Sequence, residues 1–441
     1  MIKFKSSLLL LVIVLAALGL IVTISVWLAK TEAGISFTAT PLTLEATTAQ
    51  PGILAQQSTS LNWLDPTSGQ SVKKLAVEGL NDVSTITYDT TNTEQVIYKV
   101  SADGKYLALA SSITTVLYGY PYSKKDQTEA AITIVDLANG EAQTVVKFDS
   151  KTALVDIAWD FSTPDVIGFA TLPRASLNNH YEIMPMEMLY PGPSTNLGNL
   201  HLTRLKLRTT ESKTIKYELS NGYYSPMLMG LNETKFWLIN NSLTSVSSEG
   251  VVSQESAVVS TDAYYNSANF GNLSTNNDHS VVALTADYKI VVYWLKTGQK
   301  QELSLAKTGS NTQVTSLAVS RTGTEIAFVG QASDYDSSTT PSSNTTINTL
   351  WYYNLDTGSS QKLTSWTDTP TYGVGKSIQA DLISRSLVWS PDGKQLAAML
   401  PKSDTASPLA QSELKVFTIG ESGLPTSVDL GAVSTRLIRW Q

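Results

Sequence analysis

The residues best suited to metal chemistry lie in one stretch, residues 172–200. There Met184, Met186 and Met188 alternate, with His180 shortly before them. Thioether sulfurs are soft ligands that favour Cu(I), and a nearby imidazole could complete such a site. Methionine is equally suited to filling irregular apolar gaps. We favour this second interpretation, an apolar loop that plugs or docks, and keep Cu(I) as the alternative. No cofactor is expected.

Aromatic side chains in similar stretches could recognise a partner. Tyr118, Tyr120 and Tyr122 stand in a compact Tyr-Gly-Tyr-Pro-Tyr run. Aromatic rings suit protein interfaces and stacking on sugars, although they could also pack locally over the protein. The candidate partner-binding residues are Tyr118, Tyr120, Tyr122, Tyr181, Tyr190 and Trp366.

The usual catalytic motifs are absent from the sequence. The only histidines are His180, His201 and His279, and there is no Gly-x-Ser-x-Gly elbow, His-Glu-x-x-His motif or phosphate-binding glycine loop. Residues 334–336 (Asp-Tyr-Asp) begin like a calcium loop but lack the glycine and the distal glutamate of an EF-hand. We therefore expect that the chain is not an enzyme.

Composition excludes further functions. The net charge is −7 and no run of Lys or Arg occurs, whereas a nucleic-acid partner needs a clustered basic face. Cysteine is absent, which excludes disulfides, thiolate zinc sites and cysteine nucleophiles. Only 16% of residues are charged, and the abundance of Ser, Thr and Asn favours a β-rich surface over a helical one.

The elements that must position these residues are strand–turn–strand repeats. Residues 387–397 combine an alternating apolar strand, a Ser-Pro-Asp-Gly turn and a second strand. Each copy is followed by an apolar strand, a second turn and a more polar strand, so that each unit has four strands. Copies of the first motif occur at residues 98–108 and 317–327, with weaker ones at 158–163, 230–236 and 276–283.

Four-stranded units that repeat every roughly 40–70 residues predict an all-β chain folded as a β-propeller. Ser-Pro-Asp-Gly-Lys before an apolar strand, followed by motifs such as Asn-Leu-Asp-Thr-Gly and Lys-Leu-Thr, resembles the TolB-type propeller repeat over about residues 90–430. The terminal residues 435–441 resemble a first strand, and residues 52–77 supply the three strands that follow one. We therefore predict seven blades, closed by pairing the N- and C-terminal strands, with six as the alternative.

The N-terminus has the features of a membrane anchor. Residues 8–29 form an uncharged apolar run, which as a helix would span a bilayer core of about 30 Å. Lys3 and Lys5 precede it, so the N-terminus is expected in the cytoplasm and the rest outside. A cleaved signal peptide is the alternative. The predicted division is a cytoplasmic stub and transmembrane helix over residues 1–30, a polar linker over 31–50 and a propeller over 51–441.

One end of the predicted propeller carries the longer insertions, and such loops usually hold binding residues. We therefore expect a single-pass, extracytoplasmic scaffold in the cell envelope, whose loop-rich face binds another envelope protein or a cell-wall glycan. The resemblance to TolB-type propellers implies an envelope protein. The alternatives are a propeller hydrolase with a channel metal, for example at Asp156 or Asp160, and a sensor or assembly subunit of an envelope complex. The insertions are expected at residues 111–130, 171–200, 331–349, 366–383 and 401–412.

Overall fold

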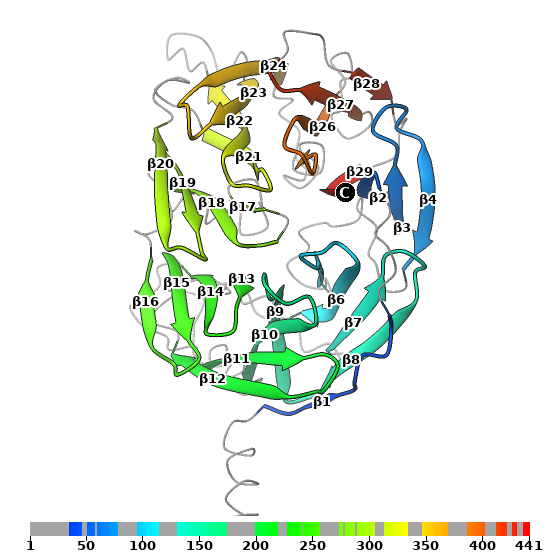
Figure 1. The fold of residues 1–441 in the computed structure, drawn as a ribbon, viewed down its shortest axis with the longest axis vertical. Helices are drawn as coiled ribbons and strands as arrows, with labels where there is room; N and C mark the ends of the chain where they lie inside the picture. The colour runs from blue at the N-terminus through cyan, green and yellow to red at the C-terminus, as the bar shows by residue number, and fades with distance from the viewer. Residues whose placement is uncertain are drawn as a thin grey trace, which may run out of the picture.

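Alternating strands and tight turns build the repeat that the structure contains. In this computed structural model, the strands form seven antiparallel sheets around a ring, which is a seven-bladed β-propeller (Figure 1). Six sheets have four strands and one has five. The structure describes residues 35–45, 51–57, 60–77, 95–113, 130–173, 199–218, 227–240, 242–255, 273–276, 278–286, 289–304, 313–333, 346–368, 386–401, 412–420, 426–429 and 435–441.

The blades are numbered in chain order, and each begins with its innermost strand. The first contains β5 (Gln95–Val100), β6 (Tyr106–Ile113), β7 (Ala131–Asp136) and β8 (Ala142–Phe148). The second contains β9 (Thr152–Trp159), β10 (Val166–Pro173), β11 (Asn199–Lys206) and β12 (Ser212–Glu218). The third contains β13 (Met227–Leu231), β14 (Lys235–Asn240), β15 (Ser242–Ser247) and β16 (Val252–Gln254).

The remaining four blades complete the ring. The fourth contains β17 (Leu273–Thr275), β18 (Val281–Ala286), β19 (Lys289–Trp294) and β20 (Gln299–Ser304). The fifth contains β21 (Gln313–Val319), β22 (Glu325–Ser333), β23 (Thr346–Asn354) and β24 (Ser360–Asp368). The sixth contains β25 (Leu387–Trp389), β26 (Gln395–Pro401), β27 (Ser412–Thr418) and β28 (Thr426–Asp429). The seventh contains β29 (Thr435–Trp440), β2 (Ile53–Gln57), β3 (Ser60–Leu64) and β4 (Ser71–Ala76).

The turn between the first and second strands of a blade requires a left-handed residue. Gly104, Gly323 and Gly393 hold this position, with φ of 75°, 79° and 71°. The glycine N–H donates to the carbonyl at the start of the turn, as from Gly393 to Ser390 at 3.0 Å. Glycine adopts this conformation without a Cβ clash, so the turn chemistry predicted from the repeats is confirmed.

The C-terminal strand closes the ring by pairing with a strand near the N-terminal end of the described chain. Strand β29 pairs antiparallel with β2, with Ile53 opposite Trp440 and Gln57 opposite Thr435. The backbones of Gly52 and Gln441 exchange two further hydrogen bonds, each of 2.9 Å. The seventh blade is therefore composite, as predicted, and the alternative of six blades is wrong. Pairing removes two sheet edges that would otherwise be open.

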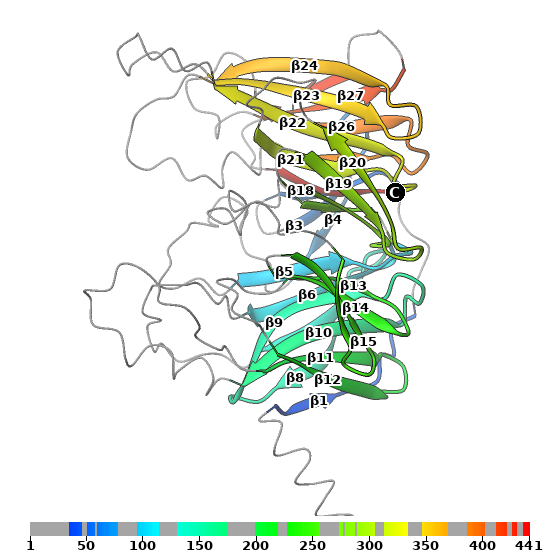
Figure 2. The same cartoon turned by 90° about the vertical axis from the view of Figure 1, so that its left-hand side faces the viewer.

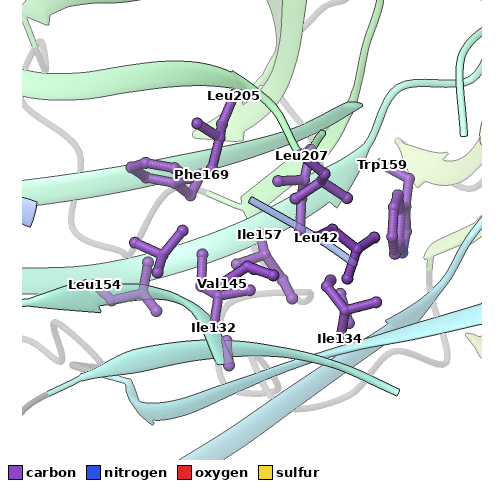
Figure 3. Packing of buried hydrophobic residues seen from close by; sticks show 14 of the residues in the cluster. Leu42, Ile132, Ile134, Val145, Leu154, Ile157, Trp159, Phe169, Leu205 and Leu207 are labelled. Carbon is purple, nitrogen blue, oxygen red and sulfur yellow. The ribbon is translucent and has the colours of Figure 1, made fainter. Parts of the chain in front are cut away.

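Each pair of neighbouring blades encloses its own hydrophobic cluster. Between the first two blades, Ile132 and Val145 of one sheet meet Ile157 and Phe169 of the other (Figure 3). Seven such clusters follow the ring, one for each neighbouring pair. Because every sheet packs on two others, both faces of its strands are apolar where they meet a neighbour.

A strand before the propeller adds to the outside of the first blade. β1 (Phe37–Ala39) pairs antiparallel with β8, with Phe37 opposite Phe148 and Ala39 opposite Val146. The chain then reaches the second blade, where the Leu42 N–H donates to the Leu207 carbonyl at 2.8 Å. We call residues 35–45 the N-terminal strap. Figure 1 shows β1 along the outer edge of the ring.

The strap differs from the free polar linker expected over residues 31–50. Leu42 is only 2% exposed and belongs to the cluster between the first two blades, and Phe37 and Leu44 pack against that cluster. The physical reason is that the outer strand of the first blade offers unpaired N–H and C=O groups, which β1 satisfies. The apolar residues among the threonines of this segment are the sequence signal for it.

The proposed membrane anchor precedes the described part of the chain. Residues 8–29 lie outside the described residues, so the transmembrane helix remains a prediction. Over the ranges that the structure describes, no helical segment has both the length and the apolar character that crossing a bilayer requires.

Candidate functional site

The antiparallel order of each blade gives the propeller two distinct ends. Turns that join first to second and third to fourth strands lie at one end, here called the short-turn end. All other connections lie at the opposite, loop-rich end. Figure 2 shows the strands from the side, with the short turns gathered at one edge. The longest connections between second and third strands, all at the loop-rich end, span residues 114–130, 174–198, 334–345 and 402–411.

Most of the candidate partner-binding residues fall within these connections. Tyr118, Tyr120 and Tyr122 belong to residues 114–130, and Tyr181 and Tyr190 to residues 174–198, as do His180, Met184, Met186 and Met188. All of them lie outside the described residues. Their roles in partner binding or Cu(I) binding therefore remain predictions.

Trp366 is placed differently from the expectation. It was expected in an insertion beginning at residue 366, whereas it lies inside strand β24, opposite Asn348. The indole is half-buried and packs against the cluster between the fifth and sixth blades, which contains Trp389. Its buried Nε1 has no hydrogen-bond partner among the described residues. Strand β24 is longer than its repeat predicts, because pairing with β23 continues to Asp368.

Charged and polar side chains gather around the axis of the ring. Lys99 of the first blade donates from Nζ to the Leu228 carbonyl of the third blade at 2.7 Å and lies 3.4 Å from Oδ2 of Asp156 in the second. The buried carboxylate of Asp156 also accepts the N–H groups of Leu228 and Ile157, at 2.6 and 2.7 Å. Burial raises the pKa of Asp156, while Lys99 and the two N–H groups oppose that shift.

His279 reaches with its side chain from the fourth blade across this axis to the first blade. It occupies the turn position that glycine holds in other blades, with φ of 60°. Its Nε2 lies 3.1 Å from the Val100 carbonyl of the first blade, and its Nδ1 lies 3.1 Å from the Thr275 hydroxyl. Because a carbonyl can only accept, Nε2 carries the proton and Nδ1 accepts. Burial lowers the pKa of His279 to about 4, so the imidazole is neutral at neutral pH.

Arg439, in strand β29 of the seventh blade, adds further hydrogen bonds to the first blade. Its guanidinium donates to the carbonyls of Ser101 and Ala102 in the first blade, at 2.6 and 2.9 Å. Gln441 donates to the Gly104 carbonyl of the same turn at 2.7 Å. Burial lowers the pKa of Arg439 to about 10, so it remains charged at neutral pH. We call Lys99, Asp156, His279 and Arg439 the axial network.

The axial network consists of hydrogen bonds and an ion pair that hold the blades together. Each of its polar groups described above is bonded to another part of the protein, and together these bonds join the first blade to the second, third, fourth and seventh. A contact between the first and fourth blades, which are not neighbours, must pass across the axis. The network therefore stabilises the ring at this position.

The carboxylates considered for a channel metal are already engaged. Oδ1 of Asp160 accepts the N–H groups of Ser162 and Thr163 at 2.8 and 3.0 Å, and its Oδ2 lies 3.2 Å from Arg204. Asp156 is held as described above. Among the described residues, no group of three or more His, Asp or Glu side chains could hold a metal ion. The channel-metal alternative therefore finds no ligand set in this part of the chain.

Sequence reasoning missed the axial network, although a signal for it was present. Lys99 and Arg439 hold the same position of the repeat, immediately before the residue that ends the first strand. The other copies place the uncharged residues Val388, Ala318, Ala158, Gly230 and Ser274 there. A charge at a position that is otherwise uncharged and lies in an inner strand indicates a buried polar partner.

Comparisons with known proteins found distant structural likenesses but no sequence relative. No protein-family model and no curated protein matches the sequence. Among solved structures, oligogalacturonate lyase from Vibrio parahaemolyticus is 11% identical, with 88% of this chain and 98% of that chain covered and a TM-score of 0.45. TolB from Acinetobacter baumannii is 12% identical, covering 88% and 66%, with a TM-score of 0.34. The periplasmic gluconolactonase of Pseudomonas aeruginosa is 12% identical, covering 88% and 99%, with a TM-score of 0.42.

The expectation that the chain is not an enzyme is contradicted by these comparisons. A lyase and a lactonase are among the similar structures, and others are prolyl peptidases. Absence of familiar catalytic motifs does not exclude catalysis, because one fold can host many unrelated functions. All of these likenesses have TM-scores below 0.5, and no activity is transferred from them.

Proposed function

We propose that the chain is a membrane-anchored, extracytoplasmic β-propeller that binds another envelope protein or a cell-wall glycan at its loop-rich end. The apolar run at residues 8–29, with Lys3 and Lys5 before it, supports the anchor and its orientation. A sensor or assembly subunit of an envelope complex would use the same surface. Among these roles, binding of a partner at the loop-rich end is the one that the contrast between the two ends of the propeller supports best.

The contrast between these ends carries the proposal. At the short-turn end, glycine turns together with His279 and Arg439 engage polar groups within the protein. At the loop-rich end, the connections spanning residues 114–130 and 174–198 hold the tyrosines, the methionines and His180. Long connections on a rigid scaffold are where recognition residues usually lie, and tyrosine is enriched at interfaces.

Site-specific photocrosslinking in native membranes tests the proposal. A benzophenone amino acid would replace Tyr118 or Tyr181 at the loop-rich end and, as the matched control, the exposed Asn139 in a short turn of the first blade. We expect one discrete adduct, protein or glycan, from the loop-rich positions and none from Asn139. An adduct that forms equally from Asn139, or no adduct from either tyrosine position, would contradict binding at this end.

A further inference from the structure

The strap fixes the place where the chain reaches the propeller. The Ser36 N–H donates to the Thr152 hydroxyl at 3.0 Å, and the Asp149 N–H donates to the Ser36 carbonyl at 3.2 Å. Asp149 and Thr152 flank the connection from β8 to β9, which lies at the loop-rich end. Ser36 therefore lies at the outer edge of the ring, at the loop-rich end of the first blade.

From this point the strap runs to the short-turn end and is held along its length. The Thr40 N–H donates to the Val145 carbonyl at 2.9 Å, and Arg208 donates to the Leu42 carbonyl at 3.0 Å. The Tyr106 hydroxyl donates to the Leu44 carbonyl at 3.0 Å. With Leu42 buried between two blades, the strap is part of the folded domain and cannot act as a spacer.

This attachment shortens the tether to the proposed anchor. Only residues 30–35 separate Ala29, the end of the apolar run, from Ser36. Fully extended, this stretch spans at most about 25 Å. A free linker reaching residue 50 would instead span roughly 75 Å. The first blade therefore lies close to any membrane in which residues 8–29 are inserted.

We propose that the propeller rests with the loop-rich end of its first and second blades against the lipid bilayer, and that its short-turn end faces away. This orientation rests on the anchor of the proposed function. Lys147 and Lys151 are exposed beside the attachment point and suit anionic headgroups, while the nearby Asp149 carboxylate accepts the Thr152 hydroxyl at 2.7 Å. Of the two proposed partner classes, envelope protein and cell-wall glycan, the first then suits this end best, as a protein embedded in the same bilayer.

The absence of cysteine allows a direct test. Ser150→Cys places a unique thiol beside the attachment point, and Ala142→Cys places one at the opposite end of the same blade edge; both positions are exposed. The full-length protein, labelled at either thiol with a donor dye, is reconstituted in phosphatidylglycerol-containing vesicles that carry acceptor lipids. Strand β8 separates the sites by about 20 Å, so we expect roughly twofold or greater energy transfer from Ser150→Cys.

The outcomes separate the orientation from the anchor. Equal or stronger transfer from Ala142→Cys, in protein that floats with the vesicles, overturns the orientation and leaves the anchor intact. Failure of the protein to float with the vesicles overturns the anchor, and the orientation with it. A flexible Gly-Ser insert of about 20 residues between Ile35 and Ser36 is expected to abolish the difference between the two sites, because it lengthens the tether. Persistence of the difference would show that the tether does not set the orientation.

Discussion

The two ends of the propeller contrast in how their strands are connected. At the short-turn end, connections such as residues 101–105, 320–324 and 390–394 have the same length and the same left-handed glycine. At the loop-rich end, connections as different as residues 402–411 and 174–198 join equivalent strands. The comparison teaches that strand register is set at one end, which leaves the other end free to vary in sequence and length.

The contrast also changes how the buried charges are interpreted. Asp156, His279 and Arg439 all have shifted pKa values, which is a common mark of a functional site. Here each is bonded to another blade, and the shifts follow from burial. The following experiments test whether structural constraint belongs to the short-turn end and its closure, and they begin with the largest expected effect.

Removing residues 437–441 should have the largest effect. The deletion takes away most of strand β29, its pairing with β2 and the hydrogen bonds of Arg439. We expect loss of cooperative unfolding, measured by circular dichroism during thermal and urea denaturation. The matched control is Gln441→Ala, which keeps the strand and should retain a cooperative transition. A truncated chain that melts like the intact one would show that the closure contributes nothing.

Gly323→Ala should destabilise the fold more than Gly393→Ala. Both glycines have positive φ, and a Cβ in that conformation costs about 1–2 kcal/mol. At Gly323 the Cβ would also lie 2.9 Å from Val281 and from Nε1 of Trp294, whereas at Gly393 the nearest atom is 3.8 Å away. Overpacking adds about 1–3 kcal/mol. Urea denaturation of both variants measures the difference, and equal losses would contradict this account of the turns.

Leu42→Ala tests whether the strap belongs to the core. The side chain is buried between the first two blades, and truncating such a leucine costs about 2–5 kcal/mol. Since the strap lies at the edge of the fold, we expect the lower part of that range in the free energy of unfolding. Thr38→Ala, at an exposed strap position, is the matched control and should change stability by less than about 0.5 kcal/mol. Similar values for the two variants would contradict the packing of the strap.

Stability should fall as the pH is lowered from about 6.5 to 4. Burial lowers the pKa of His279 and of His201 to about 4, below the value near 6.5 of an unfolded chain. The unfolded state therefore binds more protons in this range. Each histidine lowers the free energy of unfolding by about 2–3 kcal/mol over this range. Asp156, with its raised pKa, acts in the opposite direction because the folded state binds its proton more readily.

His279→Asn separates this contribution from the rest. Asparagine tolerates positive φ and can donate a hydrogen bond, but it does not titrate. We expect urea denaturation at a series of pH values to show about half of the acid-dependent loss, with His201 responsible for the remainder. An unchanged pH profile would contradict the neutral, bonded state of His279.

Replacing residues 402–411 with a short Gly-Ser connection should have the smallest effect. The connection joins β26 to β27 at the loop-rich end, and the entropy of closing a loop changes slowly with its length. We expect a change of less than about 0.5 kcal/mol in the free energy of unfolding. A loss comparable to that of Gly323→Ala would contradict the division of roles between the two ends.

Much of the fold could be predicted from sequence, because its signals are local. The alternation of residues 387–397 and the Ser-Pro-Asp-Gly turn within them define a hairpin without any distant contact. Counting the copies, and matching residues 435–441 with residues 52–77, was enough to predict seven blades and their closure. The candidate site could be predicted less well from the sequence, since most of its residues lie in connections that do not follow the repeat.

The sequence by itself therefore determined the repeat, the turns and the number of blades, since these depend on neighbouring residues. Only the tertiary structure decided which residues meet across the ring. Val100 and His279 are 179 positions apart, and their contact exists because seven sheets curve around one axis. The same holds for the strap. Its sequence alone does not distinguish it from a linker, because its partners are the edge of the first blade and the surface of the second.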